Sequence, residues 1–144
     1  QLGAERAINY REEDFVAVLQ QATGGRGVDV ILDMVAGDYI PREIDSLAEG
    51  GRLVFIATLG GSKASIDAGV LMRRRITLTG STLRARPIAF KAAIARELHA
   101  KVWPLLAAGT LRPVIHQVFP AAQASAAHTL MESNEHIGKL VLQW

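Results

Sequence analysis

The sequence predicts an α/β fold built around a mostly parallel β-sheet. Short apolar runs alternate with longer stretches in which apolar residues recur at helical spacing, and this alternation is typical of parallel strands joined by helices. Two of the runs, at 28–35 and 52–57, are largely apolar, as expected for strands that helices cover on both faces. Glycine and proline mark the ends of most segments, so the elements can be assigned in order.

The first half of the chain is predicted to form three strands joined by two helices. In chain order these are a strand at 6–10, a helix at 14–23, a strand at 28–35, a helix at 38–47 and a strand at 52–57. Pro41 falls in the first turn of the second helix, where its missing N–H does no harm. The strand at 28–35 should be a central strand of the sheet, because its apolar run is continuous.

The second half continues the alternation. It is predicted to contain a turn of helix at 68–72, a strand at 76–83, a helix at 87–108, a strand at 114–119, a helix at 122–132 and a strand at 139–144. The strand at 76–83 alternates Ile and Leu with Thr and Ser, which indicates an edge strand with one buried face. Pro104 should kink or divide the long helix, because proline cannot donate the helical hydrogen bond.

The composition excludes several classes of function. The 144 residues carry 16 Lys and Arg against 14 Asp and Glu, a formal charge of +2, which gives no concentrated basic face for nucleic acid. The absence of cysteine excludes disulfides and thiolate zinc sites within these residues, and it favours a reducing compartment. No apolar run approaches the roughly 18 residues of a membrane helix, and no secretory signal opens the sequence. We therefore expect a cytoplasmic protein that binds neither nucleic acid nor membrane.

Three features are predicted at the carboxyl ends of strands, where open parallel sheets bind ligands. Tyr10 either flanks an adenosine group or packs in the core or on the surface. Asp33 either binds a ribose hydroxyl or caps a neighbouring helix. The Gly-Gly-Ser loop at 60–62 either approaches a ligand or forms a plain turn. By contrast, the glycines at 24–27 follow a helix and precede a strand, which is the wrong order for a phosphate cradle, so they are interpreted as a turn.

Metal and hydrolase chemistry find no support in the residue pattern. The four histidines, His99, His116, His128 and His136, lack metal-ligand spacing with a partner. No serine lies in the elbow sequence of an α/β-hydrolase nucleophile. The arginines at 73–75, together with Arg84 and Arg86, either bind a phosphate or form a solvated turn.

Five segments, in order and at the expected spacing, carry a resemblance that runs the length of the chain. They are LGAERAINYREED at 2–14, GVDVILDMVAG at 27–37, LAEGGRLV at 47–54, LMRRRITLTGSTLR at 71–84 and IGKLVL at 137–142. Together they resemble the C-terminal part of the zinc-independent quinone oxidoreductases, the zeta-crystallin-like branch of the medium-chain dehydrogenase/reductase superfamily.

The resemblance implies an incomplete, doubly wound Rossmann-type parallel sheet. Residues 1–110 would form part of an NAD(P)-binding domain, and residues 111–144 would belong with an N-terminal substrate domain. In relatives that domain, the first strand with its glycine-rich turn and a second strand with a selective lysine all precede the matched region. Since the chain opens at Gln1, we expect it to begin inside a larger protein. The missing pair of strands would lie between 6–10 and 28–35.

The resemblance also implies hydride transfer from NADPH, with NADH possible and no metal, to quinones or similar electron-poor acceptors. No catalytic residue is assigned within the chain, which we expect to be inactive alone. In relatives the residue at Tyr10 helps hold the 2′-phosphate, and the one at Val35 lines the adenine side. The residues at Thr58, Leu59, Ser81, Thr82 and Leu83 would approach the nicotinamide half of the cofactor. The residue at His136 would also border the cofactor. The usual residue at the last of these positions is often Asn.

Assembly and competing functions complete the predictions. The edge strand at 76–83 resembles the one through which these reductases pair, so we expect a homodimer. A second hypothesis is a non-catalytic nucleotide-binding or structural module from a naturally truncated relative. A third is another doubly wound enzyme such as a methyltransferase, which needs a glycine-rich first turn and an acidic residue ending its second strand. What precedes Gln1 would separate the three.

Overall fold

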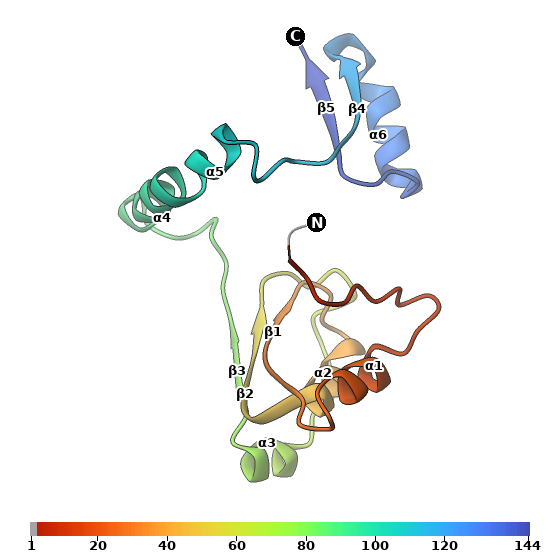
Figure 1. Cartoon of the computed structure of the whole chain (residues 1–144), viewed down its shortest axis with the longest axis vertical. Helices are drawn as coiled ribbons and strands as arrows, with labels where there is room; N and C mark the ends of the chain where they lie inside the picture. The colour runs from red at the N-terminus through yellow and green to blue at the C-terminus, as the bar shows by residue number, and fades with distance from the viewer. Residues whose placement is uncertain (1–2) are drawn as a thin grey trace. The chain divides into compact units, whose positions relative to one another are not determined.

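The computed structural model of the chain describes residues 3–144, which form two compact units, Gly3–Ile88 and Ala89–Trp144 (Figure 1). The predicted α/β class is confirmed, because every strand pair in the described residues is parallel. The two units divide near the start of the long helix, whereas the predicted domain boundary lies at 110/111. The boundary at 110/111 separates residues of the cofactor-binding domain from residues of the substrate domain in a larger protein. It stays a prediction.

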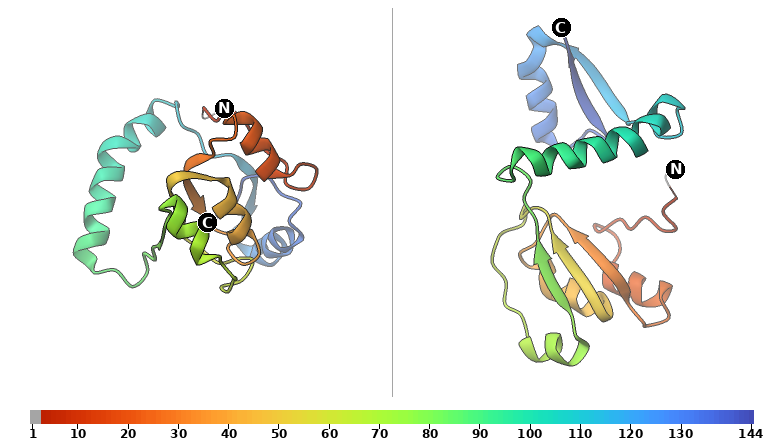
Figure 2. Two further views of the ribbon diagram at one scale, coloured as in Figure 1. Left: turned by 90° about the horizontal axis from the view of Figure 1, so that it is seen from below. Right: turned by 90° about the vertical axis from the view of Figure 1, so that its left-hand side faces the viewer.

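The first unit is a three-stranded parallel sheet covered by helices (Figure 2). Its elements are α1 (Phe15–Ala22), β1 (Val28–Asp33), α2 (Tyr39–Ser46), β2 (Leu47–Phe55), α3 (Ala68–Arg74) and β3 (Thr77–Gly80). The strand order is β1-β2-β3, with Leu53 of β2 opposite Ile31 and Leu78. Helices α2 and α3 pack on β2. The core consists of Ala36, Ile40, Ile44, Leu47 and Leu53.

The predicted strand at 6–10 is wrong. Residues 6–9 are irregular, and from Asn9 the chain forms a turn in which the Asn9 carbonyl accepts from the N–H groups of Glu12 and Glu13, both at 2.9 Å. Arg6 is paired with Glu13 across this turn. A strand requires a hydrogen-bonded neighbour, and no described strand pairs with this segment, so local turn bonds determine its structure.

The predicted central position of the strand at 28–35 is also wrong for the described sheet. Only β2 pairs with β1, which therefore lies at an edge. Val30 and Leu32, two residues apart and so on one face, are 60% and 64% exposed. Helices cover only the opposite face of the sheet. One face of this apolar run is therefore buried and the other is exposed.

Local signals account for the helices that the sequence predicts correctly. Helix α1 begins after Asp14, whose carboxylate accepts from the Val16 N–H at 3.1 Å. Helix α3 begins after Asp67, which accepts from the N–H groups of Gly69 and Val70. Such caps satisfy backbone donors that have no partner within the helix.

The second unit is a parallel pair of strands joined by a helix. It contains most of α4 (Ile88–Lys101), then α5 (Trp103–Ala107), β4 (Ile115–Pro120), the short 3₁₀ turn η1 (Ala121–Gln123), α6 (Ala124–Ser133) and β5 (Lys139–Gln143). The predicted division by Pro104 is confirmed, because α4 ends before it and Pro104 lies in the first turn of α5. Phe119 and Ala127 are buried where α6 packs on the strands.

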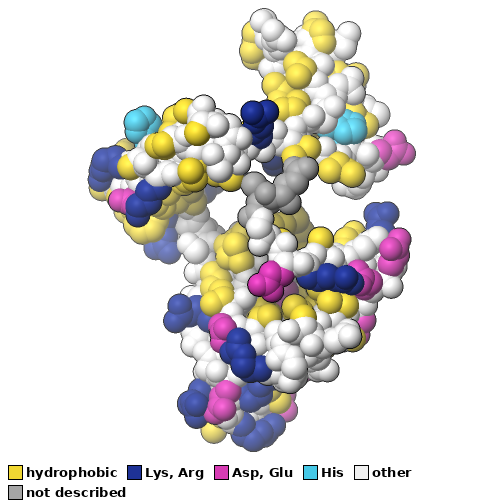
Figure 3. Space-filling model, in the orientation of Figure 1, with side chains coloured by type: hydrophobic (Ala, Val, Ile, Leu, Met, Phe, Trp, Pro, Cys, Tyr) yellow, Lys and Arg dark blue, Asp and Glu magenta, His cyan; other side chains and the backbone are white. Residues whose placement is uncertain are grey.

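Among the described residues, no helix is both long and apolar enough to cross a membrane. Charged side chains of both signs are distributed over the first unit, with Lys and Arg gathered around α3 (Figure 3). Two of the arginines at 73–75 have structural partners. Arg74 donates to the Ile44 carbonyl at 3.0 Å and to that of Leu47, and Arg75 pairs with Glu49 at 2.8 Å.

Candidate functional site

The candidate site lies at the carboxyl ends of the three parallel strands of the first unit. Backbone hydrogen bonds join the segments that follow β1 and β2: the Leu59 N–H donates to the Met34 carbonyl at 3.1 Å, and the Gly60 N–H donates to the Val35 carbonyl at 2.7 Å. After β3, the Ser81 N–H donates to the Phe55 carbonyl at 2.9 Å. The three strand ends therefore form one connected surface, at the edge where open parallel sheets bind ligands.

Two glycines allow the first two loops to meet. Gly37 has φ +56°, and a Cβ atom there would lie 2.4 Å from the Gly60 carbonyl oxygen. A Cβ atom on Gly60 would lie 3.0 Å from a Val35 methyl group. Both positions thus need glycine for close backbone approach. In the loop at 60–62, this close packing against Val35 explains why Gly60 is a glycine.

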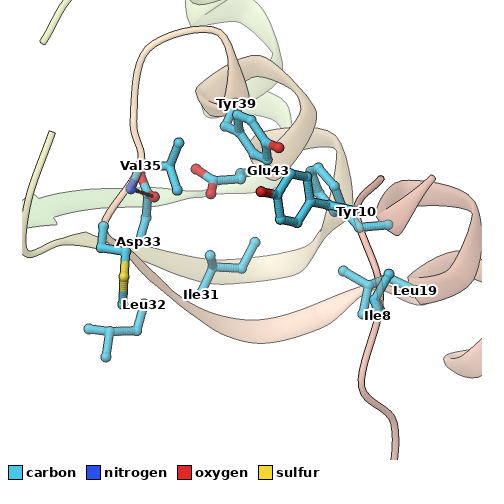
Figure 4. A pocket seen from close by; sticks show the side chains of 11 residues that line it. Ile8, Tyr10, Leu19, Ile31, Leu32, Asp33, Val35, Tyr39 and Glu43 are labelled. Carbon is cyan, nitrogen blue, oxygen red and sulfur yellow. Dashed lines mark hydrogen bonds between the residues drawn. The ribbon is translucent and has the colours of Figure 1, made fainter. Parts of the chain in front are cut away.

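The first cavity of the site measures about 270 Å³ and lies beside β1 (Figure 4). Its walls are mainly apolar and aromatic. They are formed by Ile8, Tyr10, Phe15, Leu19, Ile31, Leu32, Asp33, Met34, Val35, Tyr39 and Glu43. The Phe15 and Tyr39 rings stack at 5.7 Å with 2° between their planes, and the Arg42 guanidinium lies 4.5 Å from the Phe15 ring centre. This stack ties α1 to α2 and fixes one wall.

Two buried carboxyl groups lie at this cavity. Asp33, 3% exposed, ends β1 and accepts from the N–H groups of Val35 at 2.6 Å and Ala36 at 2.9 Å. Asp33 therefore closes the turn that follows β1 and caps no helix, since α2 begins only at Tyr39 with Asp38 at its N-cap. These two N–H groups are occupied by Asp33, so this turn presents neither of them as a donor to a phosphate.

Glu43 is the second carboxyl group, and it comes from α2. It is 6% exposed, and its Oε2 atom has no hydrogen-bond partner among the described residues. Burial first, then the negative charge of Asp33 and hydrogen bonding to that carboxylate, raise the pKa of Glu43 from 4.5 to about 7. Near neutral pH Glu43 is therefore protonated in about half of the molecules.

The second cavity, of about 400 Å³, lies at the ends of β2 and β3. It is lined by Phe55, Ile56, Ala57, Thr58, Gly80, Ser81, Thr82 and Arg86. The Arg86 Nε atom donates to the Thr82 carbonyl at 3.3 Å, which holds the guanidinium near the strand end. Hydroxyl groups and one cation make this cavity more polar than the first.

The structure brings together some of the predicted site residues and separates others. Tyr10 and Val35 line the first cavity, and Thr58, Ser81 and Thr82 line the second. Leu59 and Leu83 are 80% and 52% exposed and line neither.

His136 lies in the second unit and is not among the residues that line either cavity of the first. Its ring is 6.2 Å from that of His116, edge to face, and its Nδ1 atom has no partner among the described residues. Within residues 3–144 no group of three metal-ligating side chains gathers.

Sequence reasoning missed Glu43, although the sequence held a signal for it. Glu43 shares helical spacing with Ile40, Ile44 and Leu47, which places it on the face of α2 that packs on the sheet. An acidic residue within an apolar helical stripe indicates a buried carboxyl group. Such groups need partners or a shifted pKa.

Comparison with known proteins gives this arrangement a family. The chain matches the zinc-binding dehydrogenase family over residues 2–142 and belongs to it. It is 31% identical over 146 residues to quinone oxidoreductase 1 of Escherichia coli, covering 97% of this chain and 43% of that protein. It is 28% identical over 145 residues to a 2-haloacrylate reductase of a Burkholderia species, covering 98% of this chain and 42% of that protein.

Solved structures agree with the sequence comparison. The crystal structure of E. coli quinone oxidoreductase complexed with NADPH matches with a TM-score of 0.77 at 28% identity, covering 96% of this chain and 44% of that one. These findings confirm the Rossmann-type fold class and the resemblance to the quinone oxidoreductases. The chain spans less than half the length of the relatives that it matches.

Proposed function

We propose that the chain forms part of an NAD(P)H-dependent oxidoreductase that passes hydride from NADPH to quinones or similar electron-poor acceptors. The observation that carries this proposal is a pair of cavities at the carboxyl ends of the parallel strands, in a chain whose relatives include quinone oxidoreductases. When bound, the nicotinamide supplies the hydride chemistry. The protein binds and orients the cofactor and keeps water out of the site.

The two cavities suit the two ends of such a cofactor. The first cavity offers aromatic and aliphatic walls for the adenosine end, including Tyr10 and Val35, and a buried polar atom on Glu43. The second offers the hydroxyl groups of Thr58, Ser81 and Thr82 to the polar nicotinamide end. We assign pyrophosphate binding to no residue of this chain, because Asp33 occupies the two N–H groups of the first turn.

Titration of the purified chain with NADPH and NADH, followed by nicotinamide fluorescence, tests the proposal. We expect NADPH to bind more tightly than NADH. Tyr10→Ala should weaken the binding of NADPH more than that of NADH, because Tyr10 would lie by the 2′-phosphate. Adding a quinone should cause no NADPH oxidation by the chain alone. Failure of both dinucleotides to bind, at millimolar concentration, to a longer form of the protein that includes the glycine-rich turn would contradict the proposal. Binding without turnover in any longer form of the protein would favour the non-catalytic module.

A further inference from the structure

The turn that follows β1, at 34–37, contains a strained backbone conformation. Ala36 has φ +59°, in the left-handed region where a Cβ atom crowds the backbone and which residues other than glycine rarely adopt. Such a conformation persists only where neighbouring groups hold the backbone in it, and it is found chiefly at functional sites. The groups that hold this turn therefore determine the shape of the strand ends.

Hydrogen bonds hold the turn from two sides. The Asp33 carboxylate accepts from the Val35 N–H at 2.6 Å and from the Ala36 N–H at 2.9 Å. On the other side the Val35 carbonyl accepts from the Gly60 N–H at 2.7 Å, which ties the turn to the loop at 60–62. A shift of the Asp33 carboxylate would therefore reach both loops at the ends of β1 and β2.

Asp33 is held in its turn by Glu43 of α2. This helix begins directly after the strained turn, where the Tyr39 N–H donates to the Ala36 carbonyl at 3.2 Å, and Glu43 lies one helical turn later on the buried face. Glu43 hydrogen-bonds to the Asp33 carboxylate, and Figure 4 shows its carboxyl group beside Asp33 and Val35. Only the neutral acid can donate this hydrogen bond, because two carboxylates are acceptors alone and repel each other.

The surroundings of Glu43 offer no cation that would offset a second negative charge. Among the described residues, the other ionisable side chains that line this cavity are Asp33, Tyr10 and Tyr39. Arg42, on the same helix, pairs with Asp14 at 2.6 Å, and Arg74 of α3 donates to backbone carbonyl groups. Any further strand placed beside β1 would bury Glu43 more deeply and favour the neutral acid more strongly.

We propose that Glu43 is a positioning residue whose neutral carboxyl group, by donating to Asp33, holds the strained turn at 34–37 and the loop at 60–62 in place. When the carboxyl group ionises, this hydrogen bond is lost and the turn opens more often. The inference rests on the proposed function in one respect, since it is there that Val35 of this turn would lie beside the cofactor. The opening itself is a property of the chain and is measurable without a ligand.

Amide hydrogen exchange of the whole chain, followed by NMR and corrected for the intrinsic effect of pH, tests this assignment. Between pH 6 and 8 the opening equilibrium at the Ala36 N–H should rise about tenfold, because the Glu43 pKa is about 7 in the closed turn and 4.5 when exposed. Glu43→Gln should abolish this rise and keep the protection seen at pH 6, because its NH₂ group donates to Asp33 at every pH. Asp45→Asn, at an exposed position on the same helix, is the matched control and should behave as the wild type does.

Urea separates local opening of the turn from unfolding of the first unit. Below the unfolding transition, exchange at Ala36 should not change with urea, whereas exchange at the buried Leu53 of β2 should rise, because only unfolding exposes much new surface.

Three results would overturn the positioning role and leave the proposed function in place. They are a wild-type opening equilibrium at Ala36 that does not change with pH, the same rise in Glu43→Gln, and a urea dependence at Ala36 equal to that at Leu53. If Glu43→Gln does not fold, as judged by far-UV circular dichroism, the pH and urea dependence of the wild type still decide. Failure of a longer form of the protein to bind either dinucleotide would overturn the proposed function alone.

Discussion

At the residue scale, the raised pKa of Glu43 links the stability of the first unit to pH. The pKa of Glu43 is raised from 4.5 to about 7 in the folded chain, first by burial and then by Asp33. The folded state therefore holds this proton more tightly than the unfolded chain does. Its contribution to stability is complete below pH 4.5 and is lost as the pH rises to about 7.

Replacing Glu43 by Gln should remove this pH dependence, because the amide keeps the shape and hydrogen bonding of the neutral acid without titrating. Between pH 5 and 8 the free energy of unfolding of the wild type should fall relative to that of Glu43→Gln, by up to about 3 kcal/mol. Urea denaturation followed by far-UV circular dichroism measures this difference. The exposed Glu49→Gln is the control, and its profile should run parallel to that of the wild type. A parallel profile for Glu43→Gln as well would disprove the linkage.

Sequence reasoning at this scale succeeds where a residue acts through its own backbone. The expectation that Asp33 bonds nearby backbone came close, although it closes the turn after β1 and does not cap a helix. The role of Glu43 depends on Asp33 and Tyr10, which come from other segments. Its spacing reveals burial, but the sequence alone does not show what it faces.

At the element scale, Arg74 joins three neighbouring elements. From the last turn of α3 its guanidinium donates to the Ile44 carbonyl at the end of α2, at 3.0 Å, and to the Leu47 carbonyl at the start of β2. Carbonyl groups at the end of a helix lack partners within the helix. Hydrogen bonds from a charged donor to such groups are stronger than neutral ones.

Arg74→Met should therefore destabilise the first unit by about 1–3 kcal/mol, because it keeps the aliphatic stem but leaves carbonyl groups unpaired. Arg73→Met is the matched control, one residue earlier on the same helix and exposed, and it should change stability by less than about 0.5 kcal/mol. Chemical denaturation of both variants provides the comparison. Equal effects from the two would show that Arg74 acts only as a surface charge.

The elements also show why some predictions succeed and others fail. Helices α1, α2, α3 and the divided pair α4 and α5 follow from caps and prolines within each segment. A strand depends on its neighbour instead. Residues 6–10 carry a strand-like pattern but form a turn, and β1 carries the pattern of a central strand but lies at an edge. The division at Ile88 likewise depends on contacts between distant residues and left no local signal.

At the scale of the whole molecule, the sheet of the first unit has two edges that pair with no other described strand. One edge is β1, with Val30 and Leu32 exposed, and the other is β3, the predicted dimer strand. Unpaired edges expose backbone donors and acceptors and favour association. The homodimer through residues 76–83 thus remains a prediction, and β1 offers a competing geometry.

Light scattering across a range of protein concentrations distinguishes these arrangements. We expect a mass twice the 15.5 kDa of one chain, because pairing across β3 satisfies its free backbone groups. Thr77→Lys with Thr79→Lys places charge at that edge and should yield a monomer, whereas Val30→Lys, on the other edge, should leave the dimer intact. Loss of the dimer in Val30→Lys alone would instead assign pairing to β1. Because a β1 dimer would cover the strand that lines the first cavity, it should also weaken NADPH binding as the protein concentration rises, whereas a β3 dimer should not. A single-chain mass at every concentration would refute both geometries.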